Sequence, residues 1–91
     1  MADRLMTVNA YTTLDLVDAK AEGHGFTEEA FATLNVTSPR KQPDHVSLQL
    51  ELDPTELDTL SPHADTVRLS PDDARKLAAA LEKHAETVEQ A

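Results

Sequence analysis

Apolar and polar residues alternate along much of the chain up to about residue 69, which is the pattern of strands with one face in a core. The alternation predicts four strands, over about residues 5–22, 30–37, 45–52 and 66–69. The third is the clearest, because apolar side chains at Val46, Leu48, Leu50 and Leu52 are separated by single polar residues. One face of that strand is therefore expected in the core and the other in water.

The first strand changes its apolar face partway along. Apolar side chains stand at even positions as far as Leu16, whereas Ala19 and Ala21 stand at odd positions. A β-bulge or a break near Val17 would account for this change. The glycines of the following segment, 23–25, predict a turn.

Three further segments connect the strands. Residues 27–33 fit either a short helix, opened by Thr27, or a strand, and the alternation of Ala30 and its successors favours the strand. Residues 38–44 are expected to form a loop, because two prolines interrupt regular pairing there. Residues 53–57 fit one helical turn.

The best-defined element is a helix over about residues 71–89. Ser70 is suited to an N-cap and Pro71 to the first helical position, and apolar residues recur at spacings of three and four. The sequence thus predicts one α+β domain over residues 1–91, an antiparallel sheet of about four strands with one long C-terminal helix packed on one face. The other face, rich in Thr, Asn, Ser and Gln, is expected to be either solvated or a dimer surface; the strand order stays open.

The composition points to a thin core. The chain has 13 Ala, 12 Leu and 6 Val, with one Tyr, two Phe and no Trp. Alanine buries little surface, so stability must come mainly from Leu and Val, at roughly 1.5–3 kcal/mol per fully buried side chain. Small domains with such cores often oligomerise, and we expect a homodimer.

The charge is strongly negative, at −9, with 17 acidic and 8 basic residues. Such a chain is poorly suited to nucleic acid or to anionic membranes, whose phosphates require Lys and Arg. Acidic residues spread over the whole chain, with only four Lys, favour adaptation to a salty cytoplasm, where screening removes the self-repulsion.

The chain has no cysteine, no signal-peptide pattern and no long apolar run, so we expect a soluble, cytoplasmic protein without disulfides. No metal motif is present: the four His are scattered, without a pair at helical spacing, and we expect neither a metal nor a cofactor. No catalytic constellation is recognisable either. The sequence leaves enzymatic activity undecided but favours a non-enzymatic role.

Two exposed segments are candidate contact sites. His24 lies between two glycines, in a turn that could bring it close to a ligand, although a turn that merely needs glycine explains the same residues. Arg40 and Lys41 lie between two prolines and could attract an anionic ligand or a partner's carboxylates, although a solvated loop is the simpler interpretation.

Three stretches, Leu14–Phe31, Leu34–Lys41 and Leu69–Ala85, resemble a family of short, acidic, uncharacterised haloarchaeal proteins, a domain of unknown function. The resemblance covers nearly the whole chain and implies a salt-adapted cytoplasmic protein. It brings no catalytic or binding residues with it. The leading expectation is a small interaction or accessory protein with a protein partner; the alternative is a small-ligand or metal-binding domain using the 23–25 turn and the 38–44 loop.

Overall fold

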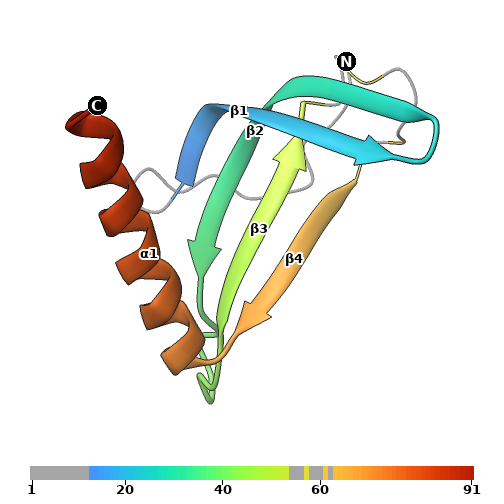
Figure 1. Ribbon diagram of the computed structural model, residues 1–91. Coiled ribbons are helices and arrows are strands. Elements are labelled where there is room, and N and C mark those ends of the chain that lie inside the picture. The colour runs from blue at the N-terminus through green and yellow to red at the C-terminus, as the bar shows by residue number, and fades with distance from the viewer. Residues whose placement is uncertain (1–12, 54–56, 58–60, 62) are drawn as a thin grey trace.

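The computed structural model describes residues 13–53, 57, 61 and 63–91. It contains an antiparallel sheet and a C-terminal helix (Figure 1), which confirms the α+β class. The strands lie side by side in chain order: β1 (Thr13–Gly23), β2 (Phe26–Thr37), β3 (Val46–Leu52) and β4 (Ala64–Leu69), followed by α1 (Pro71–Glu89). The order left open by the sequence is therefore a simple meander.

The bulge expected near Val17 is present in β1. Leu14 pairs with Leu34 and Val17 with Ala32, so two residues of β1 oppose the single Thr33 of β2. The extra residue returns the later apolar side chains to the face that carries Leu14, which is the change of parity seen in the sequence.

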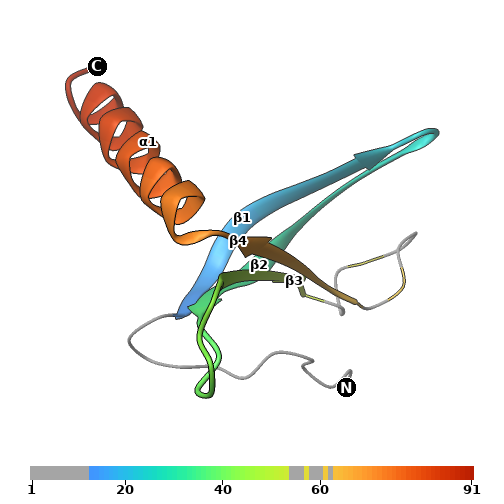
Figure 2. The same ribbon diagram turned by 90° about the horizontal axis from the view of Figure 1, so that it is seen from below.

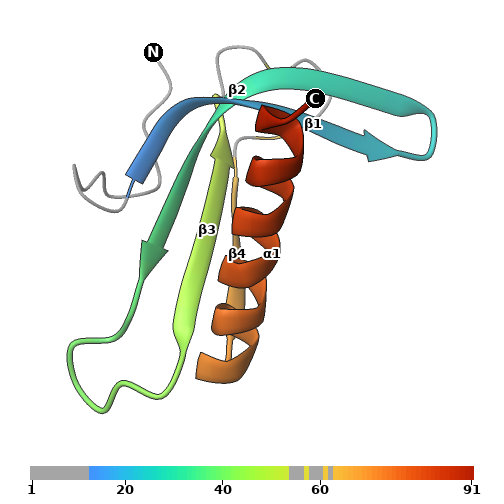
Figure 3. The same ribbon diagram turned by 60° about the vertical axis from the view of Figure 1, so that its left-hand side comes forward.

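The hairpin between β1 and β2 closes at a two-residue turn, His24-Gly25, in which Gly25 has a φ of 81°. Pairing continues from Gly23 with Phe26 along the hairpin, so residues 27–33 form a strand and not a helix. The expected start of this strand, residue 30, was wrong by four residues, because Thr27 and Glu29 face cross-strand partners even though the sequence there is polar. β1 and β2 curve, and their hairpin end projects from the sheet (Figures 1 and 3).

The remaining boundaries differ little from expectation. β3 begins at Val46, and β4 begins at Ala64, two residues early, because Ala64 pairs with Glu51. The expected first strand extended to residue 5, and its part before residue 13 lies outside the described residues, as does most of the one-turn helix expected at 53–57.

The small core lies on one face of the sheet. Among the described residues, Ala30, Ala32 and Leu52 are the buried apolar ones, and Leu50 and Leu57 pack against them half-buried. Alanine contributes two of these three, so the described residues bury little apolar surface.

The helix has the expected bounds but not the expected position. The sequence predicts it packed on one face of the sheet, yet no residue of α1 is buried, and α1 contacts the sheet mainly at β4. Figures 1 and 2 show α1 diverging from the strands after β4. The single-residue connection explains this, because Ser70 is extended, with φ −64° and ψ 160°, and directs the helix away from β4.

No helix in the described part of the chain is both long and apolar enough to cross a membrane.

Candidate interaction surfaces

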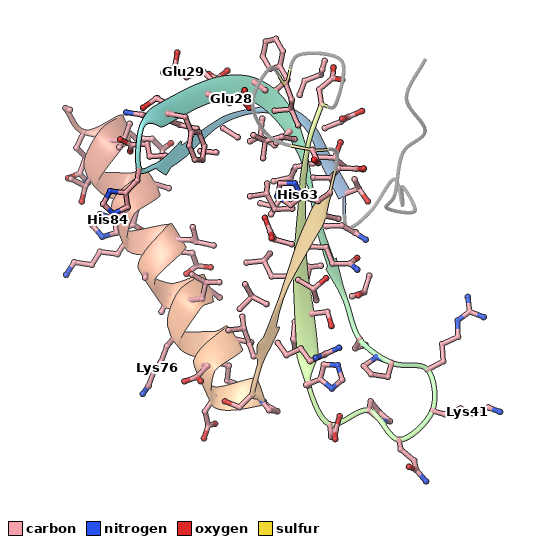
Figure 4. All side chains as sticks on the ribbon, turned by 90° about the vertical axis from the view of Figure 1, so that its right-hand side faces the viewer. Glu28, Glu29, Lys41, His63, Lys76 and His84 are labelled. Atoms are coloured by element: carbon pink, nitrogen blue, oxygen red, sulfur yellow. The ribbon has the colours of Figure 1, made fainter. Side chains whose placement is uncertain are left out.

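The first surface is the apolar stripe of α1, which we call the helix stripe; it consists of Ala74, Leu77, Ala78, Leu81, Ala85 and Val88. Leu77, Leu81 and Val88 are 37%, 63% and 73% exposed. Lys76 stands nearly opposite the stripe on a helix of 3.6 residues per turn, and Figure 4 shows Lys76 on the side of α1 away from the sheet. The stripe is therefore turned toward the sheet, but its later residues Leu81 and Val88 stay largely exposed.

The second surface is the face of the sheet that carries the core, which we call the apolar sheet face. Cross-strand partners share a face, and the rows Leu34–Leu50 and Val36–Leu48–Val67 belong to this one. Val36 and Val67 are 44% and 51% exposed, and the leucines are half-buried. Large apolar side chains thus remain in water on both surfaces of one chain.

The opposite face of the sheet holds a ladder of polar side chains. The Thr13 hydroxyl donates to Asn35 Oδ1 at 2.9 Å, and Asn35 Nδ2 donates to Gln49 Oε1 at 3.4 Å. Thr33, Asn35 and Glu51 are buried. The centre of this face is therefore buried and not solvated, which corrects one of the two interpretations that the sequence allowed. Hydrogen bonding within the sheet satisfies these groups and fixes the strand register.

His24 lies at the tip of the β1–β2 hairpin and is exposed. A Cβ added to the preceding Gly23 would clash with Cε1 of Phe26, so the ring of Phe26 occupies the space that a side chain at position 23 would need. Gly25 adopts the left-handed backbone. Both glycines are thus explained by the turn itself.

Arg40 and Lys41 lie in the exposed loop between β2 and β3, and Figure 4 shows Lys41 extending from it. His24 precedes β2 and this loop follows it, so the two candidate sites lie at opposite ends of a 12-residue strand. The structure does not bring them together, and a small ligand would contact one or the other.

Two histidines form local pairs. Nδ1 of His45 lies 2.6 Å from Oδ1 of Asp44, and this hydrogen bond, with the charge of a protonated His45, lowers the pKa of Asp44. Nδ1 of His63 lies 2.7 Å from the carbonyl oxygen of Ser61, which is the main cause of a raised pKa at His63; Asp65, 3.3 Å from Nε2, raises it further. Among the described residues, no three His, Asp or Glu side chains gather as metal ligands would.

An open hollow of about 470 Å³ lies on the curved hairpin. Its lining combines charged and small residues: Asp18, Ala19, Lys20, Glu29, Ala30 and Phe31. The charged side chains come from both strands, and Lys20 is also 3.6 Å from Glu22. Nothing in this hollow resembles the convergence of polar groups in an apolar pocket that is typical of small-molecule sites.

Sequence reasoning missed the exposure of the helix stripe and the burial of Glu28 and Glu51, which are 8% and 3% exposed. The stripe was read as core because periodicity shows which side of a helix is apolar and not what covers it. For Glu51 the one available signal is its place within the clearest strand.

The model of a family described as "Family of unknown function (DUF6360)" matches residues 1–90. No curated protein and no solved structure matches the chain.

Proposed function

The chain belongs to this family of unknown function, and we propose that it is a small non-enzymatic interaction protein, an accessory module of a salt-adapted cytoplasm that acts through contacts with other proteins. The observation that carries the proposal is the exposure of the helix stripe and the apolar sheet face within one chain. Contiguous apolar surface of this kind on a soluble domain marks a place where another protein binds.

The charge of the chain supports a contact of this type. In about 1 M salt the Debye length is about 3 Å, so attraction between distant charges contributes little to binding. Affinity under those conditions rests on apolar burial, which high concentrations of many salts do not weaken. This chain has a net charge of −9 and keeps apolar surface exposed, and both features suit association in such a solvent.

Arg40 and Lys41 supply a second, polar contact. They are exposed on the β2–β3 loop, at the end of β2 far from the hairpin tip. Two adjacent cations on a strongly acidic molecule form a local attractive site for a partner's carboxylates, and at high salt such a site acts only at contact distance. We infer that the loop contributes to the choice of partner more than to affinity.

The test is a pull-down of tagged protein from native lysate in molar KCl, with mass spectrometry of the retained proteins. A stoichiometric partner lost with Arg40→Glu/Lys41→Glu supports the proposal and locates the polar contact. Arg75→Glu/Lys76→Glu is the matched control, because it makes the same charge change at an adjacent Arg–Lys pair on α1. An empty pull-down at every protein concentration, with wild type and variants alike, contradicts the proposal.

A further inference from the structure

The outer edge of β1 has no strand beside it among the described residues. The sheet order places β1 at one side, and β3 pairs with residues 32–37 of β2. Residues 18–31 of the described chain therefore form a ribbon of two strands, which is the part that projects from the sheet in Figures 1 and 3. Two-stranded ribbons are only marginally stable in water, so a third strand at this edge would stabilise the hairpin.

The backbone groups that face outward on this edge follow from the pairing of the hairpin. The carbonyl of Phe31 accepts the amide of Asp53 at 2.8 Å, on the side of β2 where β3 lies, away from β1. Phe31 is the cross-strand partner of Asp18, so the two form a non-hydrogen-bonded pair, and the N–H and C=O of Asp18 point away from β2. The same direction recurs at every second residue, so Lys20 and Glu22 also point theirs outward.

The side chains of these three outward residues alternate in charge, negative, positive and negative in chain order. They are exposed, whereas the residues between them, Ala19 and Ala21, are small and half-buried on the opposite face. The pairing of β1 is regular from Val17 to Gly23, and this segment contains no proline or further bulge that would block an added strand. The edge is therefore open to pairing, and its charges decide which strand fits.

A second copy of β1 has the complementary charges. Two copies of one strand related by a two-fold axis pair antiparallel, and the hydrogen-bond pattern sets residues of the same parity opposite each other. With Ala19 opposite Ala19, Asp18 of each copy lies opposite Lys20 of the other, at backbone positions that hydrogen-bond. Moving the register so that Lys20 lies opposite Lys20 places like charges together, which is unfavourable.

One further register also opposes unlike charges, Lys20 opposite Glu22 of the second copy. Lys20 already lies 3.6 Å from Glu22 of its own chain, whereas no ion pair of Asp18 is found in the described part of the chain. The register centred on Ala19 gives Asp18 a cation, and the register centred on Ala21 gives Glu22 a second one. The first therefore pairs more of the charges on this edge.

The other edge of the sheet lacks this complementarity. β4 also carries one acidic and one basic residue, Asp65 and Arg68. They have opposite parity, so a two-fold pairing of β4 with itself never sets one opposite the other. Of the two edges, the β1 edge is the one suited to a second copy.

We propose that the outer edge of β1 binds the same edge of a second copy of this chain, so that the two sheets join through an antiparallel β1–β1 pair with Asp18 of each copy opposite Lys20 of the other. Backbone hydrogen bonds provide the attraction, and the charges select the register. The contact uses neither the helix stripe nor Arg40 and Lys41. The inference thus goes beyond the proposed function and stands or falls separately from it.

Hydrogen exchange is the first measurement, by NMR in molar KCl at low and high protein concentration. Exchange at the amides of Asp18 and Lys20 should slow by roughly tenfold or more as dimers form, whereas Ala19 and Ala21, whose amides already bond to β2, should change much less. Light scattering at the high concentration should give twice 9.9 kDa. A monomer at that concentration overturns the inference, and so does a dimer in which these two outward amides exchange as fast as in the monomer.

Charge reversal tests the register. Asp18→Lys leaves two cations at the paired positions and Lys20→Asp leaves two anions, so each variant alone should dimerise roughly tenfold or more weakly than the wild type. An equimolar mixture opposes unlike charges again and should form a mixed dimer, which also shows that both variants are folded. Asp72→Lys and Lys76→Asp, which make the same charge changes on α1, should leave the wild-type dimer intact.

A mixture that stays as monomeric as its two components overturns the inference. Single variants that dimerise as strongly as the wild type overturn it too. Neither result affects the proposed function, which the pull-down from lysate tests through Arg40 and Lys41.

Discussion

The hydroxyl of Thr33 donates a hydrogen bond to Oδ1 of Asp15 at 2.8 Å, across the point where β1 carries its extra residue. The same carboxylate oxygen accepts the backbone amide of Leu16 at 3.1 Å. Leu16 has a φ of 55°, a left-handed conformation that costs a leucine roughly 1–2 kcal/mol. Asp15 thus stabilises the bulge through hydrogen bonds to both strands. The bulge determines on which face of the sheet each later side chain of β1 lies.

Removing this carboxylate should weaken the fold. Asp15→Ala leaves the Thr33 hydroxyl and the Leu16 amide without their acceptor, and we expect a loss of about 1–2 kcal/mol in the free energy of unfolding. A double-mutant cycle with Thr33→Val, measured by chemical denaturation, isolates the pair. Strictly additive losses would show that the hydrogen bond contributes nothing to the bulge.

Glycine at position 16 should be tolerated or stabilising. Leu16 is 71% exposed, so replacing its side chain loses little burial, and glycine adopts the left-handed backbone without strain. We expect a gain of up to about 1 kcal/mol. The matched control is Leu14→Gly: Leu14 is 60% exposed in regular strand, where glycine should cost about 0.5–1 kcal/mol. Equal losses at the two positions would contradict the left-handed assignment.

The cost in stability of replacing Gly23 should depend on the side chain at position 26, whereas the cost of replacing Gly25 should not. Gly23→Ala places a Cβ in the space of the Phe26 ring, so its cost in stability should largely disappear in a Phe26→Ala background. Gly25→Ala meets no atom within 4 Å but is strained by its φ of 81°, at roughly 1–2 kcal/mol, whatever stands at position 26. Thermal melts of the three single variants and the two double variants decide this. A Phe26-dependent cost at position 25 would be the contrary result.

The sequence was informative wherever a local pattern determines local structure. The parity change around Val17 located the bulge, and Ser70 with Pro71 placed the start of α1. It failed where the outcome depends on what lies beside an element: Glu28 looks like a surface residue but is buried, and the start of β2 was missed with it. The direction of α1 depends on one residue's backbone angles, which no periodicity records.

The candidate contact residues show the same difference between what a local pattern predicts and what it does not. His24 was assigned to a turn and Arg40–Lys41 to a loop, and the structure has them there. The two sites are separated by the length of β2, and residue types could not predict that distance. Twelve residues span a much shorter distance in a helix than in a strand. The exposure of the helix stripe likewise depends on where α1 lies relative to the sheet, which residue types do not show.

The pH dependence of stability should show the contribution of His63. Its pKa is raised above 6.5, first by the Ser61 carbonyl and then by Asp65, so the protonated form is favoured in the folded state. The stabilisation is fully present below pH 6.5 and is lost as the pH rises through the raised pKa. An NMR titration should show Asp65→Asn lowering this pKa only in part, because the carbonyl of Ser61 remains. Titration of wild-type His63 at or below 6.5 would contradict the geometry.

Salt should stabilise the protein through its charge. With a net charge of −9, self-repulsion acts over a Debye length of about 10 Å at 0.1 M but only about 3 Å at 1 M. We expect a higher melting temperature, by circular dichroism, in 2 M than in 0.1 M KCl. Glu86→Lys/Glu89→Lys reduces the acidic excess and should narrow this difference, whereas Lys83→Glu, on the same helix, should widen it. Equal melting of the wild type in both salts would refute salt adaptation. A salt dependence that neither charge change alters would instead assign the effect to apolar burial, which many salts also strengthen.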